Sequence, residues 1–235
     1  MSSKPRWVPL ESNPDVMTKY IHNIGVPKKW HFVDVLGLDD DLLGMIPQPV
    51  VALIVLFPKG DKIKSAEAEL CAKIEKESQK VSDDVYFMKQ TIGNACGTIG
   101  VLHAVMNNQD EGDFKLEGIL AEFSGKTKGM DGAERGAYLE SDVGICEAHS
   151  SSAQEGQTAA PSAEESVKPH FIALVHIDGA LYELDGCKPF PINHGATSAD
   201  NFLKDSAVVC KKIMAIDPTE MNFNIMALTG GQPLF

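Results

Sequence analysis

The chain has 235 residues, 43% of them hydrophobic, and a net charge of −12 because 33 acidic residues outnumber 21 basic ones. A chain of this length buries one substantial core, so we expect a single domain over residues 1–235. An acidic protein repels phosphate backbones and attracts basic partners, which argues against nucleic acid as a ligand.

No segment predicts membrane insertion or secretion. The longest apolar run, Pro49 to Pro58, is too short to span a bilayer, and the N-terminus lacks the apolar core of a signal peptide. The five cysteines are odd in number and have no CxxC spacing, which favours a reducing compartment. We therefore expect a soluble monomer in the cytoplasm, and also in the nucleus.

Elements in the first third of the chain follow clear patterns. Asn13 and Pro14 open a helical stripe of apolar residues that Gly25 and Pro27 close. The unbroken apolar run over residues 50–57 predicts a buried central strand. Residues 63–79 favour a helix, and residues 85–88 favour a short strand.

Later elements include an apolar hairpin over residues 170–185, a helix that Ser198 opens and that ends before Pro218, and a last strand over residues 223–228. Between them, residues 147–169 are small and polar and predict a structureless loop. A loop this long in a compact domain is usually a functional lid or a disordered insertion, and composition alone does not choose between them.

Cys96 is the candidate nucleophile. Asn94 is a good N-cap for the apolar helix that follows it, which places Cys96 in the first helical turn. Free N–H groups and the positive end of the helix dipole favour a thiolate there. A buried core cysteine is the alternative for a lone thiol.

The chain's seven histidines are candidates for the base. His103 follows Cys96 by seven residues on the same helix and lies roughly 10 Å along its axis, out of reach of the sulfur. Four others have no carboxylate at a useful spacing and are expected to be surface or packing residues: His22, His31, His149 and His194.

The hairpin supplies the remaining two. Asp178 and Gly179 are a strong signal for a two-residue turn. Counting back from that turn makes His170 and Asp185 diagonal neighbours on one sheet face, close enough to hydrogen-bond. A carboxylate on an imidazole fixes its tautomer and stabilises the imidazolium. The same count pairs His176 with Glu183, so both pairs remain candidates at this point.

Gln90 is the third component of the predicted site. It precedes Cys96 by six residues across the turn that begins the helix. Its side-chain amide and the Cys96 backbone N–H could donate hydrogen bonds to the oxyanion of a tetrahedral intermediate. A solvated glutamine at a loop edge is the alternative.

Three long motifs resemble those of one known family: QTIGNACGTIG, HFIALVHIDG and LYELDGCKPFPINHG. With RWVPLESNP, FVDVLGL and FNIMALT they make nearly the whole chain resemble the ubiquitin C-terminal hydrolases, which are papain-like cysteine peptidases, and in particular their L3-like branch. The resemblance implies an α/β fold in which a central antiparallel sheet is flanked by helices on both sides, with a threaded, knotted backbone. It also implies hydrolysis of bonds after the C-terminal glycine of ubiquitin or a close ubiquitin-like modifier.

Position by position, the resemblance makes Gln90 the oxyanion glutamine, Cys96 the nucleophile, His170 the base and Asp185 the orienting carboxylate. Residues 147–169 correspond to a crossover loop that limits the size of the leaving group, so small or unfolded adducts should be preferred. Four residues resemble positions that contact the basic tail of ubiquitin: Leu10, Glu11, Asp34 and Glu220.

The implied reaction needs neither a metal nor an organic cofactor. Two features fall outside the family pattern: Cys187, which the hairpin register places near His170, and the apolar tail after Leu228. The competing hypothesis is a protein that binds ubiquitin with little turnover and uses its cysteine as a redox sensor.

Overall fold

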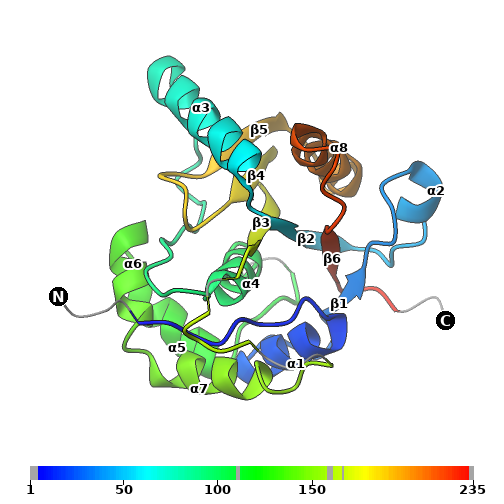
Figure 1. The fold of residues 1–235 in the computed structure, drawn as a ribbon. Helices are drawn as coiled ribbons and strands as arrows, with labels where there is room; N and C mark the ends of the chain where they lie inside the picture. The colour runs from blue at the N-terminus through cyan, green and yellow to red at the C-terminus, as the bar shows by residue number, and fades with distance from the viewer. Residues whose placement is uncertain (1–4, 110–111, 158–160, 166, 233–235) are drawn as a thin grey trace.

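A computed structural model describes residues 5–109, 112–157, 161–165 and 167–232. Its centre is a sheet in which every pairing is antiparallel, in the order β1-β6-β2-β3-β4-β5 (Figure 1). The strands are β1 (His31–Asp34), β2 (Val50–Pro58), β3 (Pro169–Ile177), β4 (Ala180–Leu184), β5 (Ile192–Ala196) and β6 (Asn224–Thr229).

Helices cover both faces of this sheet, as expected. The helices are α1 (Pro14–Ile24), α2 (Asp40–Leu43), α3 (Asp61–Glu77), α4 (Cys96–Met106), α5 (Gly118–Thr127), α6 (Gly132–Leu139), α7 (Val143–Ser152) and α8 (Phe202–Ile216). In Figure 1, α3 and α8 lie on one side of the sheet, and α1, α4, α5, α6 and α7 lie on the other. The described residues include no helix that is long and apolar enough to cross a membrane.

The central strands divide the core into two clusters. Ala52 and Ile54 of β2 point into the cluster built with α1, α4 and α5, whereas Leu53, Val55 and Phe57 point into the cluster built with α8. Successive side chains of a strand face opposite sides, so a strand buried on both faces must be apolar throughout. The sequence prediction of a buried central strand over residues 50–57 is confirmed.

The first helix also begins and ends where the sequence predicts. The Asn13 side chain accepts hydrogen bonds from the backbone N–H groups of Asp15 and Val16. Gly25 ends the helix with φ at +118°, and a Cβ there would come within 1.8 Å of the Glu117 carbonyl oxygen. Only glycine fits this combination of a left-handed backbone and a close approach.

The predicted strand over residues 85–88 does not form. Instead, the backbone N–H of Tyr86 donates to the Asn107 side chain at 2.8 Å, and that of Met88 donates to His103 Nε2 at 3.1 Å. The segment therefore satisfies its polar backbone with side chains from the last turns of α4 and just beyond. Local strand propensity does not reveal such long-range partners.

The predicted loop over residues 147–169 begins too early. Residues 147–152 complete α7, and His149 near its end is buried. Ile145 and His149, four residues apart, face the core together, although the serines around them suggest a loop. The irregular segment of this region therefore starts after Ser152, and residues 158–160 and 166 of it lie outside the described residues.

Candidate active site

Cys96 is the first residue of α4, every residue of which is buried. The preceding N-cap position belongs to Ala95 and not, as predicted, to Asn94. Asn94 has φ at +61°, and its side-chain amide donates to the backbone carbonyls of Ala163 and Glu165 at 3.2 and 3.0 Å. No side chain caps the first turn, so its N–H groups remain oriented toward the end of the helix where the thiol lies.

The hairpin brings His170 and Asp185 together. Asp178 and Gly179 both have positive φ, as a two-residue hairpin turn requires, and the pairing of Leu174 with Glu183 follows the predicted register. Nε2 of His170 lies 2.7 Å from Oδ1 of Asp185. The competing pair does not form, because Glu183 bonds Lys188 and His194 instead of His176.

The Cys96 thiol also acts on His170. Burial alone would lower the pKa of His170, but hydrogen bonds and negative charge from Asp185 and Cys96 outweigh burial and raise this pKa to about 9. The Phe57 ring and the imidazole pack nearly perpendicular to each other, with centroids 6.3 Å apart. With Nε2 held by Asp185, Nδ1 remains for the thiol, which is the arrangement of an activated nucleophile.

Asp185 carries the negative charge that prepares this histidine. Burial would raise its pKa, but His170, Lys59 and Lys188 hold the pKa well below its usual range. Oδ1 also accepts the backbone N–H of Cys187 at 2.8 Å. The carboxylate is thus ionised and fixed in orientation.

Gln90 joins the same cluster through its backbone. Its N–H donates to the Gly186 carbonyl at 2.9 Å, directly after Asp185. The side-chain N–H₂ donates to the Ile92 carbonyl at 3.0 Å, and Oε1 faces the Cys187 thiol at 3.6 Å. Gln90 therefore lies beside these residues, and its side-chain amide has a second N–H besides the one that the Ile92 carbonyl accepts.

Cys187 places a second thiol near the site. Ligand atoms of His170, Asp185 and Cys187 lie within 4.8 Å of one another. Both Asp185 oxygens, however, already accept hydrogen bonds from His170, the Cys187 N–H and Lys59. Burial first, and then the charge of Asp185, raise the pKa of the Cys187 thiol to about 11. The set has the chemistry of an acid–base pair with a protonated thiol beside it.

A cavity of about 240 Å³ opens onto Cys96. Leu10 and Glu11 line one part of it, and Gly156, Pro161 and Val167 of the segment after α7 line another. Two of the four predicted tail-binding residues therefore line the same cavity as Cys96. The cavity is mainly apolar, with a carboxylate at its wall.

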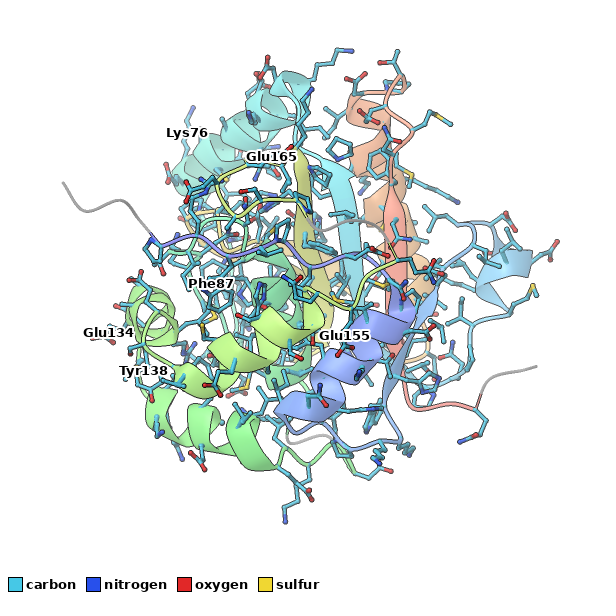
Figure 2. The ribbon with its side chains drawn as sticks, turned by 60° about the horizontal axis from the view of Figure 1, so that its bottom comes forward. Lys76, Phe87, Glu134, Tyr138, Glu155 and Glu165 are labelled. Atoms are coloured by element: carbon cyan, nitrogen blue, oxygen red, sulfur yellow. The ribbon has the colours of Figure 1, made fainter. Side chains whose placement is uncertain are left out.

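Residues 153–168, which we call the crossover segment, are tied down at both ends. Glu155 pairs with Lys19 of α1 at 2.7 Å, and the carbonyls of Ala163 and Glu165 accept hydrogen bonds from Arg6 at 2.9 and 3.2 Å. Figure 2 labels Glu155 beside α1 and Glu165 farther along the segment. Lys19, Arg6 and Asn94 thus hold the described parts of the segment beside the cavity at Cys96.

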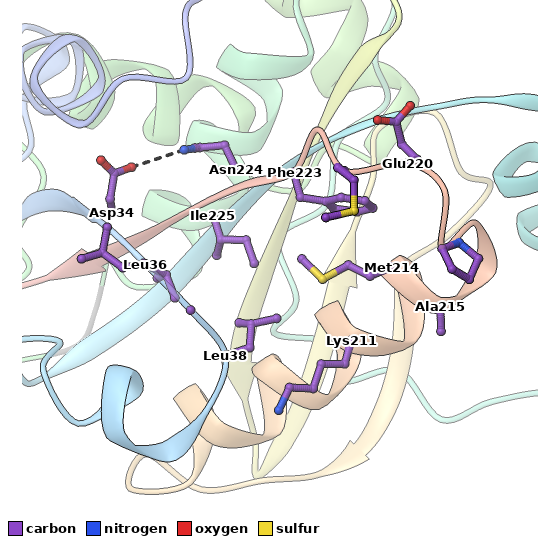
Figure 3. Close-up of a pocket in the computed structure, with 14 residues that line it drawn as sticks. Asp34, Leu36, Leu38, Lys211, Met214, Ala215, Glu220, Phe223, Asn224 and Ile225 are labelled. Atoms are coloured by element: carbon purple, nitrogen blue, oxygen red, sulfur yellow. Dashed lines mark hydrogen bonds between the residues drawn. The ribbon is translucent and has the colours of Figure 1, made fainter.

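The other two predicted tail-binding residues, Asp34 and Glu220, line a separate groove of about 720 Å³ (Figure 3). Its floor includes Leu38, Met214 and Ile225. The two cavities adjoin: Ser12, at the first cavity, bonds Asn224 of the second at 2.6 Å, and Asn224 donates to Asp34 at 3.3 Å.

Comparison with known proteins is consistent with this geometry. Residues 7–215 match the family described as "Ubiquitin carboxyl-terminal hydrolase, family 1". The chain belongs to the ubiquitin carboxyl-terminal hydrolase family. It is 49% identical over 218 residues to the ubiquitin carboxyl-terminal hydrolase of Aplysia californica, covering 93% of this chain and 99% of that protein. It is 44% identical over 223 residues to human isozyme L1, with 94% and 96% covered.

Among solved structures, the UCH37 catalytic domain of Trichinella spiralis bound to ubiquitin vinyl methyl ester matches with a TM-score of 0.73 and 25% identity. The match covers 97% of each chain. As a ubiquitin carboxyl-terminal hydrolase, this chain is a cysteine-type ubiquitinyl hydrolase with a papain-like fold, as the sequence motifs predict.

The sequence gives no indication of the charges behind Asp185. Lys59, which follows β2, bonds Asp185 at 3.0 Å, and Lys188, three residues after Asp185, lies 4.0 Å from it. Glu67 of α3 pairs with both lysines. Lys59 and Glu67 lie more than a hundred residues before Asp185, so no local spacing connects them to it.

Proposed function

We propose that Cys96 is the nucleophile, His170 its general base and acid, and Asp185 the group that orients the histidine. The contact chain from Cys96 through His170 to Asp185, at the end of a narrow cavity, carries this assignment. An imidazolium–thiolate pair held this way attacks a carbonyl carbon without further activation.

In the proposed reaction, the Cys96 thiolate attacks the carbonyl carbon of the C-terminal glycine of ubiquitin. The backbone N–H of Cys96 and the Gln90 amide donate to the oxyanion, and the amide has a second N–H for this besides the one bonded to Ile92. The His170 imidazolium then protonates the leaving amine. The same residue activates water, which hydrolyses the thioester and releases the ubiquitin carboxylate.

Ubiquitin, or a close ubiquitin-like modifier, is the proposed partner. The solved neighbour carries a ubiquitin derivative, and the two adjoining cavities of this chain suit a folded body with a flexible tail. The groove at Asp34 and Glu220 has an apolar floor and acidic edges, which favour an apolar patch bordered by basic side chains. The cavity at Leu10 and Glu11 accepts the tail and brings it to Cys96.

Turnover and binding assays on Cys96→Ala test this assignment. We expect cleavage of a fluorogenic ubiquitin conjugate to be abolished, whereas affinity for ubiquitin stays within a few fold, because the thiol supplies chemistry and the grooves supply binding. Equal loss of both would make Cys96 structural. An unmodified protein that binds ubiquitin without steady-state release of the fluorophore would favour the competing hypothesis of a ubiquitin-binding redox sensor.

We further propose that the crossover segment acts as a size filter. Small or unfolded adducts thread beneath it, whereas a folded conjugate has to stretch it beyond its attachments at Lys19, Arg6 and Asn94. Loop closure becomes only slightly more costly with length, so a longer segment opens wider without a large penalty.

Inserting about ten Gly/Ser residues near Gly156 tests the filter. Cleavage of diubiquitin should rise, and cleavage of a small fluorogenic adduct should change little. Arg6→Ala, which removes one attachment, should act in the same direction to a smaller extent. An insertion that leaves diubiquitin intact while small-adduct turnover is normal would refute the filter.

A further inference from the structure

A cation reaches the catalytic carboxylate from the side opposite the histidine. Lys59 follows the last residue of β2 directly, and Phe57 and Pro58 of that strand pair with His170 and Pro169. The backbone N–H of Lys59 donates to the Lys168 carbonyl at 3.1 Å. The end of the strand thus fixes Lys59 beside the residue pair that activates Cys96.

The side chain of Lys59 completes the hydrogen bonding of Asp185. Oδ1 accepts from His170 at 2.7 Å and from the Cys187 N–H at 2.8 Å, and Oδ2 accepts from Lys59 Nζ at 3.0 Å. The Asp185 side chain has no exposed surface, so water cannot replace a lost donor. A buried carboxylate oxygen without a partner is costly.

The neighbouring cation, Lys188, forms ion pairs with other carboxylates. Lys188 Nζ lies 4.0 Å from Oδ2, but it bonds Glu183 and lies 3.1 Å from Glu67. Glu183 also bonds His194 at 2.9 Å. Glu67 of α3 holds Lys59 from its other side at 2.9 Å. Lys188 would have to break its own pairs to take over the role of Lys59.

We propose that Lys59 is a positioning residue for hydrolysis: it holds Oδ2 of Asp185 so that Oδ1 stays on His170, and it offsets part of the carboxylate's charge. This proposal rests on the assignment of Cys96, His170 and Asp185 above. A group that holds the orienting carboxylate in this way acts through geometry and charge, without touching the substrate.

Lys59 offsets part of the negative charge of Asp185, and this affects how readily His170 gives up its proton. His170 must both stabilise the Cys96 thiolate as imidazolium and give its proton to the leaving amine. A fully uncompensated Asp185 would hold that proton more tightly and slow its transfer. Among the described residues, the charged and titratable groups around this pair are Cys96, His103, Lys59, Glu67, Lys89, Cys187 and Lys188. Of these, Lys59 is the cation in direct contact with Asp185.

Lys59→Met tests the proposal because it keeps the length of the side chain and removes its charge. We expect kcat on a fluorogenic ubiquitin amide to fall by about tenfold to a hundredfold, with KM within about twofold. The alkaline limb of kcat/KM, where His170 loses its proton, should move to higher pH. Lys59→Arg should restore most of the rate, and Lys64→Met, at an exposed lysine of α3, should match the unmodified protein.

The pKa of His170, followed by imidazole NMR in a Cys96→Ala background, gives a second measurement that does not need activity. It should rise when Lys59→Met is added and stay unchanged with Lys64→Met. Glu67→Gln leaves Lys59 on Asp185 and should reduce kcat by less than about threefold.

An unchanged kcat in Lys59→Met would overturn the proposal. A loss of rate that Arg does not restore, or that comes with no movement of the His170 pKa, would also overturn it and leave Lys59 with a role in stability alone. Neither outcome touches the assignment of the nucleophile, which the Cys96→Ala measurement decides separately.

Discussion

Two buried histidines, His170 and His149, interact with residues of α4 that are two positions apart, and their pKa values are shifted in opposite directions. His170 meets Cys96 at the start of α4 and has Asp185 on its other nitrogen. His149 meets Thr98 at 2.8 Å and has the Val8 carbonyl on its other nitrogen at 2.7 Å. The first has its pKa raised to about 9, and burial lowers the pKa of the second to about 4.

The difference lies in the partners and not in the degree of burial. Because the Val8 carbonyl can only accept, Nε2 of His149 donates to it, Nδ1 accepts from the Thr98 hydroxyl, and that oxygen accepts from Tyr20 at 3.0 Å. These hydrogen bonds join uncharged groups, and they stabilise the folded structure. An ionised carboxylate and a thiol give the same side chain the raised pKa that the proposed acid–base role of His170 uses.

The largest expected effect on kcat comes from replacing the charged partner of His170, Asp185, with a neutral residue. Asp185→Asn removes the charge and favours the wrong tautomer, so kcat should fall by about ten-thousandfold, as in other nucleophile–histidine–carboxylate systems. Steady-state kinetics on a ubiquitin fluorophore conjugate measure this. His176→Asn, on the same hairpin but away from the triad, is the control and should keep nearly full activity. A fall of less than tenfold in Asp185→Asn would contradict the comparison.

A smaller effect on rate is expected from Gln90, the proposed oxyanion donor. Gln90→Ala should lower kcat by about 100- to 1000-fold with little change in substrate affinity, because the donor acts on charge that exists only in the transition state. Measured kcat and KM separate the two contributions. A raised KM with unchanged kcat would assign Gln90 to substrate binding.

A substitution among the hydrogen-bonded residues Tyr20, Thr98 and His149 should change the stability of the protein and not its rate of hydrolysis. Thr98→Val leaves Tyr20 and His149 buried without their shared partner, which should cost about 1–3 kcal/mol of unfolding free energy. Urea denaturation measures that loss, and kcat should stay within about threefold. Ser150→Ala, at an exposed hydroxyl of α7, is the matched control and should change neither quantity. A large loss of kcat in a folded Thr98→Val protein would show that the two histidines are coupled.

The smallest effect is a pair of opposite pH dependences in stability. The folded pKa of His149, about 4, lies below the ordinary 6.5, so the stability that its neutral form contributes is lost as pH falls from 6.5 toward 4. The folded pKa of His170, about 9, lies above 6.5, so its contribution to stability is full below pH 6.5 and is lost as pH rises through 9.

Melting temperatures measured against pH should show a shallower acid slope in His149→Gln and a shallower alkaline slope in His170→Asn. His103, whose pKa burial also lowers to about 4, should preserve part of the acid slope in His149→Gln. The opposite assignment of the slopes would refute the comparison.

The parts of the site that the sequence predicts are those that depend on local geometry. A turn at Asp178 and Gly179 sets the strand register, and the register alone brings Asp185 to His170. Likewise, a long apolar run is sufficient to place β2 in the centre of the sheet. These inferences need only the period of a strand and the length of a turn.

The errors have a common cause in long-range partners. Asn94 has the composition of a helix cap, but carbonyls of the crossover segment compete for its amide and win. His149 sits in a serine-rich stretch, yet Thr98 and Val8 make it a core residue. The assignment of Asp34 and Glu220 to the tail of ubiquitin stays a prediction: they line a different groove from Leu10 and Glu11, and no local pattern separates the two grooves.

The strand order has a consequence for how the enzyme becomes active during synthesis. β6, the last strand of the chain, lies between β1 and β2, and its first residue, Asn224, bonds Ser12 beside the Cys96 cavity across 212 residues. A ribosome-bound chain that has already produced the thiol, the histidine and the aspartate therefore still lacks the middle of its sheet. We expect such a nascent chain to be inactive and to acquire hydrolase activity only once residues 224–229 have left the exit tunnel, because contacts of this sequence separation form late.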